Sequence, residues 1–301
     1  MSPLSSDVRP RASSAGLYVG REQVACALLA HDKGVTSLLA TRAVRLESPL
    51  FNGAPTSLLR SALARALAEL MLPIRGRHVP VHLVVPDALA RSAAFELEEV
   101  PANATALERL VQFRLGKELG ANTGVCVSQS LGEAEGRKVL LGATLDAGWL
   151  ELLRGACADA GIVPWTLGAA GAAIFNSFET QLAGKSGALV ALSPDAWALW
   201  AWDANGLPRP LRAQWRGTGA DESSIAAEVE RTLIAFTDGH ESRAVERLAV
   251  WPAGAGEALA SVLDERTGQR CERWSFPATL ADAAQPESPA ESVAVIGALI
   301  P

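Results

Sequence analysis

The chain has 301 residues, of which 49% are hydrophobic and only 5% aromatic, and its formal net charge is −6. A chain of this length can form two packed lobes, whose cores we expect to consist mainly of Ala, Leu and Val. The mild negative charge is spread along the chain, which argues against a nucleic-acid partner held by phosphate neutralisation. No apolar stretch reaches the roughly 18–20 residues that a membrane-spanning helix needs.

Residues 1–14 are rich in Ser, Pro and Arg and lack the apolar segment of a secretory signal, so we expect a short disordered arm. The four cysteines share no CxxC spacing and stand among apolar or small residues, as reduced core thiols of a cytosolic protein do. His78 and His82 are four residues apart, but Pro80 lies between them and prevents one regular helical face. The sequence therefore predicts no zinc site.

The first ordered segment predicts a three-stranded β-meander. Residues 16–29 alternate apolar and polar side chains with one break, and a turn at residues 32–34 leads into a third strand over residues 35–46. A helix is expected over residues 56–72, because Leu and Ala recur along one stripe until Pro73 stops it.

Two further helices and a short central strand are predicted next. Residues 79–85 are almost all apolar, as in a strand covered on both faces. Thr105 and Glu108 form a capping box, which predicts the start of a helix. Asp146 is expected to cap another helix, which ends at Gly161.

Strands over residues 125–131 and 138–144 are predicted to form a hairpin between these two helices. A strand over residues 162–167 and a helix of small residues over residues 169–183 complete the first half of the chain.

At residues 184–187 the composition changes to that of a linker, and the opening pattern then returns. Residues 188–215 repeat the order strand, break, strand, turn, strand. A helix over residues 224–236 and a strand over residues 248–251 follow, as in the first half. Two similar halves predict a duplicated fold with a cleft between its lobes.

Several short motifs carry a resemblance by their order and spacing, although no single one is specific. They are Val84-Val85-Pro86-Asp87, Phe95-Glu96-Leu97, residues 107–120, residues 140–144, Ala160-Gly161-Ile162-Val163-Pro164 and residues 295–299. In this order they resemble the PilM family of type IV pilus assembly proteins over about residues 15–300. The related MshI and the cytoplasmic part of GspL are close alternatives.

The resemblance implies an α/β fold of the actin-like (ribonuclease H-like) kind, duplicated into two lobes. Lobe I would span residues 15–183 and lobe II residues 184–301, with a small inserted α+β subdomain at about residues 91–161 of lobe I. It also implies a cytoplasmic scaffold, not an enzyme, that is peripherally associated with the inner membrane through a partner. Whether it serves a pilus, a secretion or a DNA-uptake system stays open.

The partner implied by the resemblance is the short cytoplasmic N-terminal peptide of a bitopic, PilN-like membrane protein. The groove between the inserted subdomain and lobe I would hold this peptide, and an assembly ATPase is a second implied partner. Neither nucleic acid binding nor direct membrane insertion is expected.

The nucleotide site departs from the family pattern. Relatives have an acidic residue in the first phosphate strand, where this chain has Tyr18, and the second phosphate strand here leads into Ser193-Pro194-Asp195. A phenol is a poor ligand for Mg²⁺ at neutral pH, and Pro194 has no amide to offer a phosphate. We therefore expect a degenerate site with no cofactor. Its remaining candidate residues are Gly20, Asp195, Gly254 and Gly256.

ATP with Mg²⁺ is the alternative, and it would require Asp195 to act as a displaced metal ligand; an ordinary turn residue is the reading that we favour. For the three glycines, remnant nucleotide loops and plain tight turns both stay open. A small-metabolite kinase is a third reading, for which Asp87 is the candidate base. The sequence contains no GxSxG, P-loop or GxGxxG motif.

Aromatic residues supply the candidates for partner binding. Phe95, Phe113 and Trp149 lie in the predicted subdomain, and Phe113 falls off the apolar stripe of its helix. Core packing is the alternative for all three. Trp197 and Trp215 predict either an exposed aromatic patch on lobe II or part of the core of that lobe.

Overall fold

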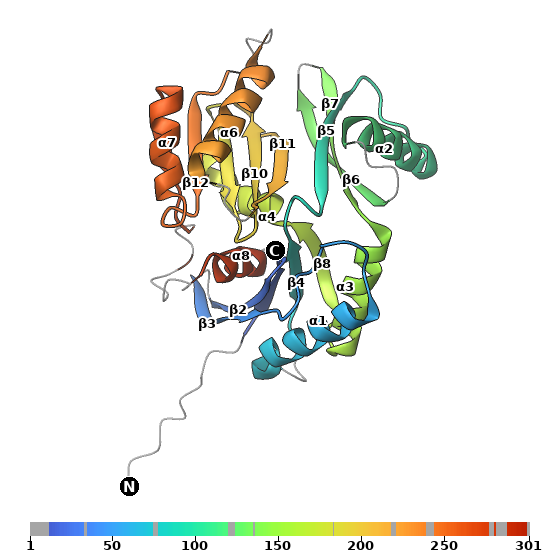
Figure 1. The fold of residues 1–301 in the computed structure, drawn as a ribbon. Helices are drawn as coiled ribbons and strands as arrows, with labels where there is room; N and C mark the ends of the chain where they lie inside the picture. The colour runs from blue at the N-terminus through green and yellow to red at the C-terminus, as the bar shows by residue number, and fades with distance from the viewer. Residues whose placement is uncertain are drawn as a thin grey trace.

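The structure is a computed structural model that describes residues 12–32, 35–74, 78–119, 124–134, 136–182, 184–217, 221–238, 244–276, 280 and 288–299. Two five-stranded sheets with the same strand arrangement form two lobes, and a smaller three-stranded sheet stands beside them (Figure 1). All but the last three residues of the predicted N-terminal arm lie outside the described residues. Within the described ranges, no helix combines the length and the apolar character needed to cross a bilayer.

Lobe I is built on a sheet with the strand order β3-β2-β1-β4-β8. Its strands are β1 (Ser14–Val19), β2 (Gln23–Asp32), β3 (Val35–Arg45), β4 (Val81–Val85) and β8 (Pro164–Ala169). The first three strands are antiparallel, which confirms the predicted meander, and β4 and β8 run parallel to β1. The helices α1 (Ser57–Leu70) and α3 (Ala147–Asp159) pack against each other and cover one face, and a short 3₁₀ turn over Leu72–Ile74 follows α1.

The inserted subdomain leaves lobe I after β4. It consists of β5 (Arg91–Leu97), α2 (Ala104–Leu119), β6 (Val125–Ala134) and β7 (Arg137–Leu145), and its antiparallel sheet has the order β5-β7-β6. The structure places α3 in the core of lobe I, because its inner face packs on α1. The subdomain therefore ends at Leu145, earlier than the predicted boundary near Gly161.

The predicted capping box at the start of α2 is wrong. Asn103 is the capping residue, since its Oδ1 accepts hydrogen bonds from the backbone N–H groups of Thr105 (2.8 Å) and Ala106 (3.3 Å). An asparagine caps a helix at least as well as a threonine does. The helix therefore begins at Ala104, one residue before the predicted cap.

Lobe II repeats the topology of lobe I with the order β11-β10-β9-β12-β13, which confirms the predicted duplication. Its strands are β9 (Gly187–Leu192), β10 (Ala196–Trp202), β11 (Pro208–Trp215), β12 (Arg247–Trp251) and β13 (Cys271–Arg273). The helices α6 (Glu222–Thr237) and α7 (Glu257–Thr267) pack against each other over one face of this sheet.

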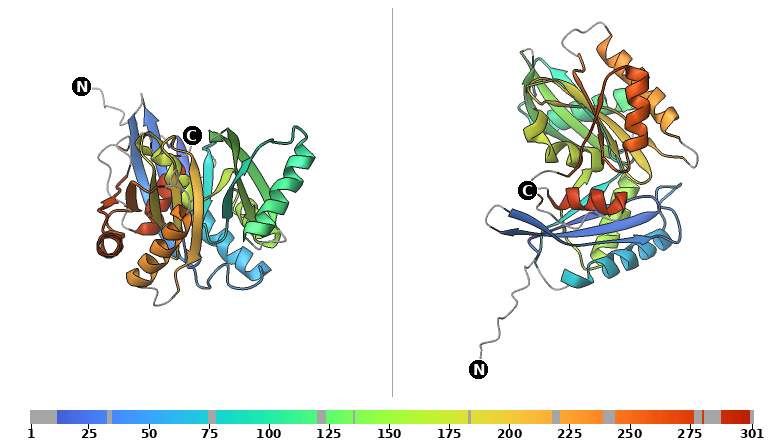
Figure 2. Two further views of the ribbon diagram at one scale, coloured as in Figure 1. Left: turned by 90° about the horizontal axis from the view of Figure 1, so that it is seen from above. Right: turned by 90° about the vertical axis from the view of Figure 1, so that its left-hand side faces the viewer.

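Three helices lie between the lobes: α4 (Ala170–Ser177), α5 (Glu179–Leu182) and α8 (Pro289–Ala298). One continuous core contains residues of α4, α8 and both large sheets, and Figure 2 shows α8 between the upper and lower parts of the molecule. Although α8 follows lobe II in the sequence, it packs on β1 and β2 of lobe I. Gly16 permits this close packing, because a Cβ atom there would collide with the carbonyl oxygen of Ala294.

Candidate functional site in the cleft between the lobes

Tyr18 and Asp195 meet where the two lobes face each other. Tyr18 is fully buried near the end of β1, and its hydroxyl donates a hydrogen bond to Oδ1 of Asp195 at 2.6 Å. Asp195 lies in the turn between β9 and β10, and its Oδ2 accepts the backbone N–H of Arg21. Burial and the nearby Asp195 carboxylate raise the pKa of Tyr18 well above its ordinary value, so the phenol stays protonated and donates.

Lobe I therefore occupies both oxygens of the Asp195 carboxylate. Asp195 lies in a turn, as the sequence favoured, but its carboxylate is also engaged by lobe I; a role as a metal ligand stays a prediction. Lobe I contributes the phenol of Tyr18 rather than a carboxylate, and Pro194 of lobe II has no backbone N–H. A magnesium–triphosphate group is normally surrounded by carboxylates, water and open backbone N–H groups, and Tyr18 and Pro194 supply neither a carboxylate nor an N–H at their positions.

The predicted nucleotide-loop glycines have different surroundings. Gly20 follows Tyr18 and lies against Asp195, since a Cβ atom at Gly20 would be 2.9 Å from Oδ2 of Asp195. Gly254 and Gly256 lie in the turn between β12 and α7. Gly256 is the capping residue at the start of α7 and packs against Val250 of β12. By contrast, nothing lies within 4 Å of a Cβ atom built on Gly254.

A second buried carboxylate joins the lobes beside this pair. Asp87 follows β4; its Oδ1 accepts the indole N–H of Trp200 in β10 at 3.1 Å, and its Oδ2 accepts the backbone N–H of Gly171 at the start of α4 at 2.6 Å. Burial raises the pKa of Asp87 to about 6. Because both oxygens accept hydrogen bonds from the protein, Asp87 is not placed as the free base that a kinase reading requires.

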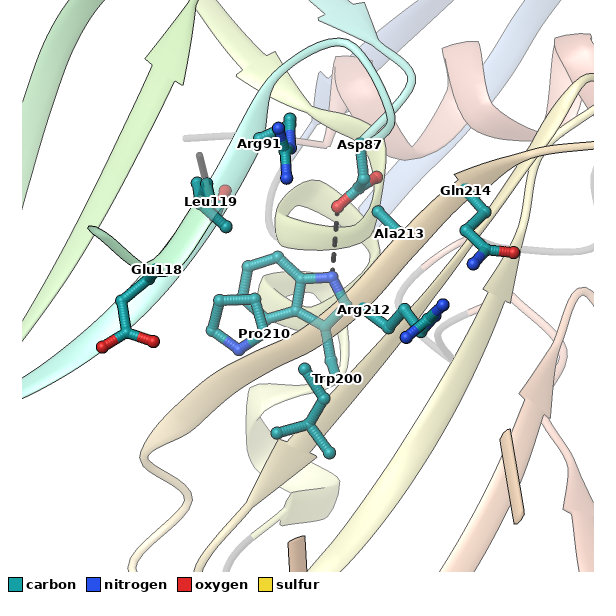
Figure 3. A pocket seen from close by; sticks show the side chains of 11 residues that line it. Asp87, Arg91, Glu118, Leu119, Trp200, Pro210, Arg212, Ala213 and Gln214 are labelled. Carbon is teal, nitrogen blue, oxygen red and sulfur yellow. Dashed lines mark hydrogen bonds between the residues drawn. The ribbon is translucent and has the colours of Figure 1, made fainter. Parts of the chain in front are cut away.

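A polar pocket of about 370 Å³ opens next to Asp87, between the inserted subdomain and lobe II. Figure 3 shows the hydrogen bond between Trp200 and Asp87 with Arg91 on the side of the inserted subdomain and Arg212 on the side of lobe II. The guanidinium of Arg212 forms an ion pair with the carboxylate of Glu228 on α6. The pocket thus lies where the edge strands β5 and β11 approach each other.

The structure buries most of the aromatic residues that were candidates for partner binding. Phe95 lies in the small core of the inserted subdomain, and Trp149 lies in the core of lobe I, so neither ring faces solvent. Both point inward because each lies on the apolar side of its strand or helix. Phe113 is 68% exposed, so of the two alternatives that the sequence left open the structure shows exposure and not core packing; its role in partner binding stays a prediction.

The predicted aromatic patch on lobe II does not form. Trp197 is buried in the core of lobe II, whereas the ring of Trp215 stacks on that of Phe51 in lobe I, with 5.9 Å between ring centroids. Because the two rings lie in different surroundings, they do not make one surface.

Sequence reasoning missed an exposed apolar strip that begins at Val163, just before β8, and continues along that strand. Val163 is 86% exposed and Trp165 73% exposed, and Leu167 continues the strip on the same side of the strand. The alternation of apolar residues at these three positions was a signal for it. An apolar segment of this kind can be a central strand, in which these side chains would be buried, or an end strand. The sequence does not decide between the two, and in the structure β8 is the end strand of the sheet.

No family model and no curated protein matches the sequence. The fold is nevertheless similar to that of solved structures. One is described as the PilM–PilN type IV pilus biogenesis complex, with a TM-score of 0.69, 16% identity and 96% of each chain covered. Another is a Bacteroides thetaiotaomicron protein with an actin-like ATPase fold and unknown function, with a TM-score of 0.56 and 11% identity over 95% of this chain and 96% of that chain.

A further similar structure is the cytoplasmic domain of EpsL, an inner membrane component of the type II secretion system of Vibrio cholerae. Its TM-score is 0.51 at 11% identity, over 95% of this chain and 94% of that chain. These similarities, together with the duplicated sheets, show that the chain has the two-lobed actin-like fold.

Proposed function

We propose that the chain is a cytoplasmic scaffold of an inner-membrane assembly platform of the type IV pilus or type II secretion kind. In this role it binds the cytoplasmic tail of a bitopic membrane protein. The exposed apolar strip on β8 is the observation that carries the proposal. The likeness to a structure described as a PilM–PilN complex, and to an inner membrane component of a secretion system, supports the choice of partner.

The strip suits an extended peptide. β8 pairs only with β4 among the described strands, so the N–H and C=O groups along its outer edge have no strand partner there. Such an edge invites an added strand, and a protein normally covers or blunts it. A tail peptide that pairs with β8 would place alternate apolar side chains over Val163, Trp165 and Leu167.

The inserted subdomain supplies a second wall for the peptide. β6 is the end strand of its sheet, and Val125 and Val127 near its start are exposed. Val125 pairs with Leu145, which belongs to the core of lobe I, so this end of β6 adjoins lobe I. The peptide would therefore lie between lobe I and the inserted subdomain.

The proposal includes a cleft that works without a magnesium–nucleotide. The hydrogen bond between Tyr18 and Asp195, and the absence of an amide at Pro194, support this part. An ATP-binding switch of the same machinery is the competing function. It requires the Asp195 carboxylate to leave Tyr18 and bind a metal ion.

Calorimetry tests both parts. The probe for the first is a synthetic peptide with the N-terminal cytoplasmic sequence of the single-span membrane protein encoded beside this chain. We expect binding that Trp165→Ala weakens at least tenfold, whereas the control Leu58→Ala, also exposed but on α1, leaves the affinity unchanged. Equal affinities for the wild type and Trp165→Ala would refute the docking strip. Micromolar binding of ATP with Mg²⁺ would support the switch instead.

A further inference from the structure

We propose that the two lobes are clasped together by the chain's own side chains, so that the closed arrangement needs no ligand in the cleft. Four contacts carry the inference, and each joins lobe I or its inserted subdomain to lobe II. The pairs are Phe51–Trp215, Tyr18–Asp195, Asp87–Trp200 and Glu96–Arg209. We call these four contacts the clasp.

The centre of the clasp is the turn that carries Asp195. Its carboxylate accepts hydrogen bonds from Tyr18 and from the backbone of Arg21 in lobe I, and its backbone carbonyl accepts the N–H of Arg216 at the end of β11. The side chain that a metal ion would need is thereby turned into a direct link between the lobes. Since Tyr18 is fully buried, breaking this link leaves a hydroxyl or a charge without a partner.

Asp87 forms the next contact and joins three elements rather than two. Its two oxygens bind Gly171 at the start of α4 and Trp200 in lobe II, while Asp87 itself lies two residues after the end of β4 of lobe I. Gly171 is required for this approach, because a Cβ atom there would be 2.5 Å from Oδ1 of Asp87. Opening the lobes would separate a buried carboxylate from the indole that it binds.

The inserted subdomain is fastened to lobe II by an ion pair. An oxygen of Glu96 on β5 lies 2.6 Å from the guanidinium of Arg209 on β11, and both side chains are mostly buried, with 24% and 16% exposed. Arg137 on β7 lies 3.8 Å from the other oxygen of Glu96. The edge strands β5 and β11 therefore meet at a charged contact with restricted access to water, where screening is weaker than at an open surface.

Phe51 has a backbone conformation that most residues avoid. Its φ is 58°, the left-handed region in which a residue with a bulky side chain is strained. Its ring lies 4.9 Å from that of Trp149 in lobe I and 5.9 Å from that of Trp215 in lobe II, measured between centroids. The strained backbone places the ring between the two lobes, which assigns Phe51 to the clasp.

Pulsed electron spin resonance tests the clasp directly. Spin labels at Leu58→Cys on α1 and Ile234→Cys on α6, both exposed positions, report the distance between the lobes. Cys126 is replaced by Ser, while Cys26, Cys157 and Cys271 are buried and burial raises the pKa of each thiol, so they resist labelling.

For the labelled wild-type chain without nucleotide we expect one narrow distance distribution, unchanged by ATP with Mg²⁺. The double substitution Tyr18→Phe and Trp200→Phe should broaden it toward longer distances. The matched control is Trp202→Phe, which also removes a buried indole hydrogen bond, but one to Lys185 within lobe II. A broad wild-type distribution that ATP with Mg²⁺ narrows would overturn the inference.

If the double variant fails to fold, Glu96→Gln combined with Arg209→Gln replaces it, because these two side chains are partly exposed whereas Tyr18 and Trp200 are fully buried. An unchanged narrow distribution in a folded clasp variant would also overturn the inference. The outcome does not depend on whether a peptide binds the apolar strip on β8, since neither label nor any substituted residue lies on that strand.

Discussion

The hydroxyl of Tyr18 in lobe I and the carboxylate of Asp195 in lobe II form a buried hydrogen bond of 2.6 Å. In the proposed function, this bond joins the two lobes without a nucleotide between them. The phenol neutralises no charge, but it gives the carboxylate a donor in a place where water is excluded. Hydrogen bonds to charged groups are among the stronger ones in proteins.

Tyr18→Phe removes only the hydroxyl and should lower the free energy of unfolding by about 1–3 kcal/mol, since Oδ1 of Asp195 loses a buried donor. Urea unfolding followed by circular dichroism measures the loss. Combining it with Asp195→Asn in a double-mutant cycle should give a coupling free energy above about 0.5 kcal/mol. Additive effects would mean that the two side chains do not act as a pair.

Asp87 should make the protein less stable as pH rises. Its pKa in the folded state is about 6, raised by burial above the ordinary value of 3.8, so the folded state binds the proton more tightly than the unfolded state. Ionisation therefore costs stability progressively between about pH 4 and pH 6. For a difference of about two units, the loss from this group is about 3 kcal/mol.

Urea unfolding at pH values from about 4 to 7 checks the prediction. Asp87→Asn should remove this group's contribution to the change of the free energy of unfolding with pH. The variant should also be less stable at every pH, because an amide accepts only one of the two N–H bonds and turns its NH₂ toward the other donor. Asp159→Asn is the control. Its pKa is lowered by Arg60, so its contribution to the slope has the opposite sign.

Periodicity and repetition predicted most of the fold. The meanders of both halves, the helix with its stop at Pro73 and the order of elements in lobe II follow from local patterns that tertiary packing does not override. The position of α3 does not follow from them, because its apolar face would suit the inserted subdomain or lobe I equally well. Only the contact with α1 decides between them.

The candidate site could be predicted only in part for a similar reason. The resemblance implies an acid where this chain has Tyr18, but the sequence does not show that the hydroxyl of Tyr18 reaches Asp195, which is 177 residues away. Likewise, Trp165 belongs to an apolar strand in the sequence, and its exposure depends on β8 being the end of a sheet. The partner of Tyr18 and the exposure of Trp165 both depend on contacts between segments far apart in the sequence.

Alanine substitutions should distinguish a glycine that close packing requires, Gly16, from a glycine in an open turn, Gly254. Gly16→Ala should lower the free energy of unfolding by about 1–3 kcal/mol or more, because its Cβ atom would collide with the backbone of α8 and force the helix to shift. Gly254→Ala should stay within about 0.5 kcal/mol of the wild type, since no atom lies within 4 Å of the added Cβ. Thermal and urea unfolding compare the two variants, and a Gly254→Ala chain as unstable as Gly16→Ala would contradict the packing argument.

Trp165 and Phe113 offer a direct comparison of two candidate docking residues, one on the edge strand of lobe I and one on the helix of the inserted subdomain. Their side chains are similarly exposed, at 73% and 68%. If the tail peptide adds a strand to β8, Trp165→Ala should weaken its binding at least tenfold, about 1.4 kcal/mol or more, as loss of a central aromatic anchor does, while Phe113→Ala stays near neutral. Calorimetric titration of both variants with the same peptide measures the difference. Loss of affinity in Phe113→Ala alone would move the docking site to the outer face of α2 and leave the strip on β8 without a role.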